Sequence, residues 1–163
     1  MPLQGAALAL SKCALFKDFS ETGIAIVASI AAERVMPAGT PLFVEGMAAD
    51  AFFVVKSGSV RVTIKRDGGQ AGDKRDVGDQ TIGYLGVGEA LGQLSLLGTA
   101  GARLVSAVTE GNTEVIEVRQ RDFVKLQAQK PQACLKLMMA VASQLGQYLG
   151  DNRDALRAAA FSR

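Results

Sequence analysis

Residues 52–65 read Phe-Phe-Val-Val-Lys-Ser-Gly-Ser-Val-Arg-Val-Thr-Ile-Lys, and this stretch decides the fold. Its apolar and β-branched residues form two short runs, one on each side of Ser57-Gly58. Such residues favour β-strands, and a glycine between two such runs favours a tight turn. The stretch is therefore predicted to form two neighbouring strands joined by a turn.

The two-residue alternation that is typical of β-strands continues on both sides of this stretch. Further strands are predicted at Thr81–Leu85, Arg103–Val108 and Thr113–Val118. Pro41 excludes a central strand position at residue 41. The segment Arg66–Gln80 is expected to be a long exposed hairpin loop. Glycines recur between these short runs. Frequent turns between short strands predict an α+β, mainly β, chain whose residues 34–118 form an antiparallel, jelly-roll-like β-roll.

Helical spacing flanks the predicted roll. Apolar residues recur at three- and four-residue steps through Leu3–Glu33, with Ser20 as a possible N-cap. After Arg119 the helical spacing returns, and Pro131 suits the first turn of a long helix. Heptad spacing along that helix is shown by Leu135, Met138, Ala142, Leu145, Leu149 and Leu156. We expect one domain over 1–163, with an N-terminal helical segment (1–33), the roll (34–118) and C-terminal helices (119–163).

Composition narrows the possible functions. The 163 residues carry a formal net charge of +2, which is too small to argue for nucleic-acid binding by field alone. Histidine is absent, and with it the commonest general base and metal ligand, which disfavours an enzyme and a zinc site. Cys13 and Cys134 are expected to be small buried residues on helices. No apolar run is long enough to span a bilayer. A secretory signal begins with a positive charge, but no positively charged side chain precedes Lys12 in this chain. We therefore expect a cytoplasmic protein.

The segment Gly92-Gln93-Leu94-Ser95-Leu96-Leu97, followed by Arg103, is the most specific chemical signal. Successive N–H groups at the start of a short helical turn form an anion nest. An arginine rising from the next strand can bind the same anion through its charged fork. A polar side chain beside the glycine can hold a sugar hydroxyl. The combination predicts a pocket for a cyclic phosphodiester on a ribose.

These residues give the chain its resemblance to the cyclic-nucleotide-binding domain family, which includes bacterial catabolite activators and the regulatory subunits of cyclic-AMP-dependent kinases. The resemblance covers nearly the whole chain. Its motifs are Pro37-Ala38-Gly39, Phe43-x-Glu45-Gly46, Phe53-Val54-Val55-Lys56-Ser57-Gly58-Ser59-Val60, a phosphate-binding cassette within 92–105 and Glu114-Val115-Ile116-Glu117-Val118. The long helix after Pro131 resembles the family's C-helix.

The resemblance implies a role for each candidate ligand-binding residue. Arg103 would pair with the cyclic phosphate, and the backbone N–H groups of Ser95 and Leu104 would complete the nest. Gly92 and Gln93 would hold the ribose. The base and the pocket wall would be contacted by Val62, Ile82, Leu94 and Tyr148.

One residue departs from the family's pattern, which usually has glutamate where this chain has Gln93. An amide accepts only a neutral hydrogen bond, which is worth about 0.5–1.5 kcal/mol against about 1.5–3 kcal/mol for a charged one. We therefore expect weakened but retained binding of cyclic AMP or cyclic GMP as ligand, with no cofactor. Cyclic AMP is favoured because Leu104 offers no side-chain hydroxyl to a guanine.

Purely structural roles are the alternatives for these residues. Arg103 can pair with Glu89 or Glu110 on the surface, and Tyr148 can be an ordinary packing residue of its helix. The heptad spacing predicts a homodimer through the C-terminal helix, or packing of that helix on the roll. The alternative function is a protein-interaction or dimerisation domain with a degenerate pocket and an unknown downstream partner.

The region after the long helix bears on DNA binding. Residues 151–163 are too short for a DNA-reading helix-turn-helix domain. We therefore expect no direct DNA binding and no membrane association, and either a stand-alone sensor or a piece of a longer protein.

Overall fold

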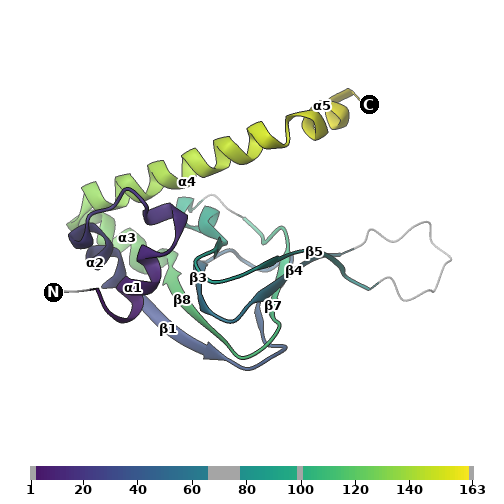
Figure 1. Cartoon of the computed structure of the whole chain (residues 1–163). Coiled ribbons are helices and arrows are strands. Elements are labelled where there is room, and N and C mark those ends of the chain that lie inside the picture. Colours follow the sequence, from purple (N-terminus) through teal and green to yellow (C-terminus); the bar gives the residue numbers. More distant parts are fainter. Residues whose placement is uncertain (1–2, 66–77, 99–100, 162–163) are drawn as a thin grey trace.

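The computed structural model describes residues 3–65, 78–98 and 101–161, and Figure 1 shows how they are arranged. Two antiparallel sheets form a roll, and helices from both ends of the chain gather on one side of it. One sheet has the strand order β1-β8-β3-β6 and the other β2-β7-β4-β5. The strands are β1 (Ala31–Met36), β2 (Pro41–Phe43), β3 (Ala51–Ser57), β4 (Val60–Ile64), β5 (Gln80–Leu85), β6 (Ala90–Leu91), β7 (Ser106–Thr109) and β8 (Thr113–Arg119). The predicted fold class is confirmed.

The N-terminal segment consists of short helices, which are α1 (Gly5–Ser11), the 3-10 helix η1 (Ala14–Phe16) and α2 (Glu21–Ala28). Ser20 caps α2 as predicted, because its side chain accepts a hydrogen bond from the Gly23 N–H at 3.2 Å. The prediction of helix through Glu33 is wrong at its end, since β1 already begins at Ala31. Pairing with β8 satisfies the backbone groups of β1, and this long-range pairing overrides the local helical spacing.

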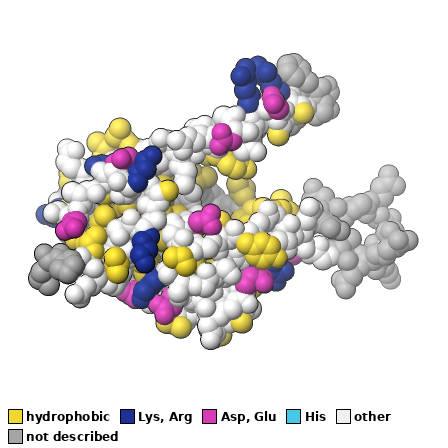
Figure 2. Space-filling view, in the orientation of Figure 1, with side chains coloured by type: hydrophobic (Ala, Val, Ile, Leu, Met, Phe, Trp, Pro, Cys, Tyr) yellow, Lys and Arg dark blue, Asp and Glu magenta, His cyan; other side chains and the backbone are white. Residues whose placement is uncertain are grey.

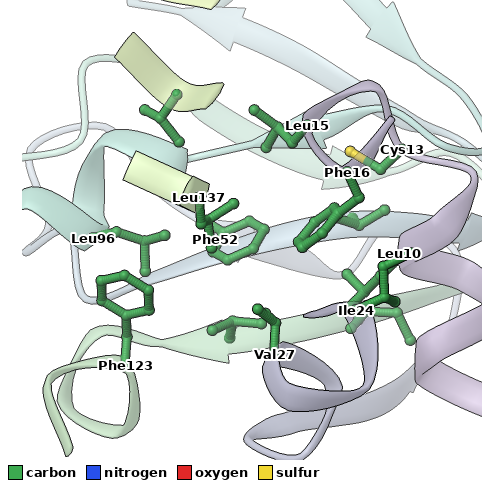
Figure 3. Packing of buried hydrophobic residues seen from close by; sticks show 14 of the residues in the cluster. Leu10, Cys13, Leu15, Phe16, Ile24, Val27, Phe52, Leu96, Phe123 and Leu137 are labelled. Carbon is green, nitrogen blue, oxygen red and sulfur yellow. The ribbon is translucent and has the colours of Figure 1, made fainter. Parts of the chain in front are cut away.

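Strand β3 separates the two parts of the core. Phe52 and Val54 face a cluster formed with the helices, whereas Phe53 and Val55 face a second cluster between the two sheets. This alternation follows from the two-residue period of a strand. Figure 3 shows the first cluster, in which Phe52 packs among residues of the N- and C-terminal helices. Because β3 is buried on both faces, it holds the sheets and the helices in one core.

The turn between β3 and β4 confirms the reading of Ser57-Gly58. Gly58 has φ +81°, and a Cβ there would lie 2.6 Å from Thr113 Oγ1 and 2.7 Å from the Asn112 carbonyl oxygen. Glycine is required at this turn by both the backbone angle and the space. Strand β5 pairs with β4 as expected of a hairpin, while most of the predicted loop (66–77) lies outside the described residues.

The C-terminal part comprises α3 (Gln120–Gln129), α4 (Pro131–Asp151) and α5 (Arg153–Phe161). Pro131 occupies the first turn of α4, as predicted. The residues of α4 that pack on the core are Cys134, Leu137 and Val141. Of the predicted heptad, Met138 packs partly against the core, whereas its leucines at positions 135, 145, 149 and 156 are exposed. The heptad spacing therefore marks a face that points largely away from the roll.

Both cysteines are buried and free. Cys134 lies on α4, but Cys13 lies in the turn between α1 and η1 rather than on a helix. Burial raises the pKa of each thiol, because the surrounding apolar side chains solvate a thiolate poorly. They act as small apolar residues, as predicted.

Candidate functional site

The site is built around a glycine that opens a short helical turn. Gly92 follows β6 directly and has φ +76°, and the 3-10 helix η2 (Gln93–Leu97) begins after it. A Cβ at this position would contact Arg103 Nη1 and would lie 3.1 Å from the Ala51 carbonyl oxygen. Glycine therefore allows both the left-handed turn and the close approach of the arginine.

Arg103 enters the same place from the segment before β7. The sequence predicted that it lies in a strand, but β7 begins at Ser106 and Arg103 follows an isolated bridge between Ala48 and Ala102. Its Nη2 donates to the Ala51 carbonyl oxygen at 2.7 Å and lies 3.6 Å from Asp50 Oδ1. The plainer reading of this arginine as a surface ion pair is wrong, because only 6% of its surface is exposed.

The carboxylates considered as partners of Arg103 are engaged elsewhere. Glu110 Oε1 accepts from Arg61 Nε at 2.5 Å. Glu89 Oε2 accepts from the Gly86 N–H at 2.7 Å. Arg103 is thus directed inward, toward the turn at Gly92.

The guanidinium of Arg103 sits in an apolar environment. Its Cζ lies 4.1 Å from the centre of the Phe43 ring and 6.0 Å from that of Phe53. Burial lowers the pKa of Arg103, and the charge of Asp50 acts in the opposite direction. Arginine keeps its proton at neutral pH even so. The Arg103 guanidinium is thus a buried cation. Its only ionic partner within the described residues is Asp50, whose side chain lies largely in solvent.

Two buried polar atoms at this place have no hydrogen-bond partner among the residues that the structure describes. They are Ser95 Oγ and Arg103 Nε. An unpaired buried polar group costs roughly 1–3 kcal/mol, so native proteins rarely retain one without a reason. The prediction for the Ser95 backbone needs correction, because its N–H already donates to the Gly92 carbonyl oxygen at 3.0 Å. The hydroxyl of Ser95, rather than its amide, is the group left for a ligand.

A cavity of about 590 Å³ opens over these residues. The predicted residues that line it are Val62, Ile82, Gly92, Gln93, Leu94, Ser95, Arg103 and Leu104. Sequence reasoning missed Phe43, Tyr84 and Leu91, which line it too. Phe43 stands in one of the motifs quoted above, and its contact with Arg103 requires the packing of β2 against the cassette. The cavity combines an apolar wall with a cationic, hydrogen-bonding end.

Tyr148 is the predicted site residue that the structure does not bring into this cavity. It lies on α4 and is 64% exposed. Figures 1 and 2 show the C-terminal half of α4 extending away from the roll. α4 instead meets the cassette through the core cluster that Leu96 shares with Leu137 and Val141, and through a hydrogen bond from Gln93 Nε2 to Gln144 Oε1, at 2.9 Å.

In the described part of the chain, no helix combines the length and the apolar character that crossing a membrane requires. No group of three or more histidine, cysteine, aspartate or glutamate side chains in that part of the chain is placed to hold a metal ion.

The sequence and the fold are similar to those of known proteins. Residues 33–130 match the family model described as "Cyclic nucleotide-binding domain". The chain is 30% identical over 131 residues to the cyclic AMP receptor protein of Thermus thermophilus, a match that covers 80% of this chain and 56% of that protein. The chain thus spans little more than half the length of that relative.

Solved structures show the same fold. The crystal structure of the Thermus thermophilus catabolite activator protein matches with a TM-score of 0.73 at 28% identity, covering 90% of this chain and 63% of that one. A cyclic nucleotide-binding domain from Methylobacillus flagellatus matches with a TM-score of 0.76, covering 99% of this chain and 89% of that one. At 20% identity, the second likeness concerns the fold alone.

Proposed function

Because this chain belongs to the cyclic nucleotide-binding domain family, we propose that the cavity around Arg103 binds a cyclic nucleotide and that the domain has a regulatory role. The observation that carries the proposal is a pair of buried polar atoms that have no partner among the described residues, the Ser95 hydroxyl and the Nε of the Arg103 guanidinium, the second of which also carries the positive charge. A phosphodiester anion supplies the acceptors that both atoms lack, together with the opposite charge.

The rest of the ligand follows from the other lining residues. Gln93, next to the phosphate site, would accept a hydrogen bond from a ribose hydroxyl. The base would cover apolar side chains of the wall, including Leu104, which is 78% exposed. Since Leu104 has no hydroxyl to offer a guanine, the proposed ligand is cyclic AMP rather than cyclic GMP.

Isothermal titration calorimetry with both nucleotides tests this function. We expect one ligand bound per chain and tighter binding of cyclic AMP. Linear 5′-AMP, which has a phosphomonoester in place of the ring phosphate, serves as the control and should bind more weakly. Absence of heat with either cyclic nucleotide at millimolar concentration would contradict the proposal.

Gln93→Glu is expected to tighten cyclic AMP binding by about 1 kcal/mol, because a charged acceptor replaces a neutral one, and rotation of the Gln144 amide would let its NH₂ group donate to the new carboxylate. Calorimetry on the parent and the variant measures this difference. In addition, 2′-deoxy cyclic AMP should lose more affinity on the variant than on the parent. Equal losses on the two proteins would show that residue 93 does not contact the ribose.

We further propose that ligand binding moves the C-terminal half of α4. The buried residues of α4 end at Val141, so the part beyond this residue is free of core packing that movement would disrupt. Tyr148 lies one helical turn, or about 6 Å, beyond Gln144 and on the same face. Closure of this half would carry Tyr148 toward the base.

Tyr148→Ala is expected to weaken cyclic AMP binding by about 1 kcal/mol through loss of an aromatic contact with the base. It should also reduce the ligand-dependent protection of residues 142–150 from hydrogen exchange, while protection of the cassette persists. If ligand and mutation both leave exchange in 142–150 unchanged, α4 is a fixed element and this mechanism is wrong.

A second candidate function is a protein-interaction or dimerisation domain. It is favoured by the exposed apolar side chains along α4 and α5, which are Leu135, Met139, Leu145, Leu149 and Leu156. A homodimer through this face is compatible with nucleotide binding, and sedimentation of the protein with and without cyclic AMP separates the two functions. A dimer that forms whether or not ligand is present, in a protein that binds no nucleotide, would favour the second function.

We infer a regulatory rather than a catalytic domain, since the chain contains no histidine with which to build a nucleophile–base pair. We also propose a cytoplasmic location and a single functional domain over 1–163, both of which are predictions from the sequence.

A further inference from the structure

One side-chain pair joins the ligand cavity to the C-terminal helix. Gln93 lines the cavity, and its Nε2 donates to Gln144 Oε1 of α4 at 2.9 Å in a partly buried position. Gln144 also lines a neighbouring groove of about 310 Å³ between η1 and α4. The two side-chain amides thus connect the cavity to α4.

The chemistry of an amide gives this bond a direction. A glutamine side chain has one accepting oxygen and one donating NH₂ group. When the NH₂ group of Gln93 is engaged by Gln144, its Oε1 is the atom left to accept a hydrogen bond. A ribose hydroxyl needs such an acceptor when it donates its proton. The hydrogen bond to the helix therefore fixes the orientation of the Gln93 amide in which Oε1 is available to the ligand.

Gln144 lies at the point where the buried face of α4 ends. Cys134, Leu137 and Val141 are the buried residues of the helix, and Gln144 is the next residue on the same face. It is where core packing ends and the extended half of the helix begins. Loss of its bond to Gln93 would release the helix from the cassette at this point.

We propose that Gln144 is a positioning residue for the ligand, which holds the amide of Gln93 so that Oε1 faces the cavity and thereby couples occupancy of the cavity to α4. The inference rests on the proposed function for its ligand, the ribose of a cyclic nucleotide. It goes beyond that function by assigning a role to a helix residue that does not itself line the cavity.

The experiment compares cyclic AMP and 2′-deoxy cyclic AMP by calorimetry on variants of the whole chain. Gln144→Ala should weaken cyclic AMP binding by about fivefold and leave binding of the deoxy ligand unchanged, as expected for one neutral hydrogen bond. Gln147→Ala is the matched control, since it removes the same side chain from the same helix and should change neither affinity. Gln144→Glu keeps an acceptor for Gln93 Nε2 and should restore the preference for the 2′-hydroxyl.

A double variant separates positioning from direct contact. Because Gln144 acts through Gln93, adding Gln144→Ala to Gln93→Ala should cause no further loss of affinity. A further loss in the double variant, or an unchanged preference for the 2′-hydroxyl in Gln144→Ala, would overturn the proposal.

Hydrogen exchange without ligand distinguishes failure of this inference from failure of the proposed function. Gln144→Ala should speed exchange of amides 142–148 by about fivefold relative to the parent, and Gln147→Ala should not. If the parent binds no cyclic nucleotide, the proposed function fails and the assigned ligand role fails with it, while this measurement still decides the coupling of cassette and helix. If exchange is the same in the parent and in Gln144→Ala, the coupling is wrong even where cyclic AMP binds.

Discussion

Arg103→Ala is expected to abolish measurable cyclic-nucleotide binding. The substitution removes the buried cation beside Ser95 and leaves the ligand's phosphate without an opposite charge. Truncating one partner of a buried charge pair costs about 2–5 kcal/mol, which corresponds to roughly 30-fold or more in affinity. Calorimetry with cyclic AMP measures the loss. A dissociation constant equal to that of the parent would show that the phosphate is bound elsewhere.

The control is Arg61→Ala, which removes an arginine of β4 from a surface ion pair with Glu110. Exposed pairs contribute at most about 1 kcal/mol to stability, and this variant should bind as the parent does. Thermal unfolding of both variants separates ligand loss from fold loss. Arg103→Ala leaves the Ala51 carbonyl without its partner, and we expect a destabilisation of about 1–3 kcal/mol with the fold retained.

Gly92→Ala is expected to remove binding as well, and to destabilise the fold. Its φ of +76° costs about 1–2 kcal/mol for a residue with a Cβ. The new methyl group would also contact Arg103 Nη1 and approach the Ala51 carbonyl oxygen to 3.1 Å, so the guanidinium must leave its place. Calorimetry and thermal unfolding measure the two effects.

Gly39→Ala is the matched control for this variant. Gly39 has φ +74°, almost the same backbone strain, but a Cβ there has no neighbour within 4 Å among the described residues. The two variants should therefore lose similar stability from strain, and only Gly92→Ala should lose ligand binding. If Gly39→Ala reduced binding equally, general destabilisation rather than displacement of Arg103 would explain the result.

The sequence predicted most of the roll because its signals are local. Two-residue alternation and β-branched residues identify β3, β4, β5 and β8, and glycine or proline marks their ends. The start of β1 escaped prediction because its pairing with β8 joins residues far apart in the sequence. Likewise, Arg103 is in the expected place but not in the expected strand, since an isolated bridge rather than a ladder holds its segment.

The helix residues of the site were harder to predict. The expected heptad begins at Leu135, but the face that meets the core begins one residue earlier, at Cys134, and continues through Leu137 and Val141. Both spacings fit an amphipathic helix, and only the packing partner selects between them. The role of Gln144 depends on a tertiary contact with Gln93 for which the sequence carries no local signal.

Binding of the cyclic phosphate at the buried Nε of Arg103, which has no partner among the described residues, can be followed at that atom. The most direct measurement is the ¹⁵N–¹H NMR signal of that Nε–H group, assigned by its disappearance in Arg103→Lys and followed during titration with cyclic AMP. We expect a downfield shift of this proton to a plateau at one ligand per chain, because the group gains a charge-assisted hydrogen bond. A signal that stays in place at saturating cyclic AMP would show that the phosphate does not bind at this nitrogen.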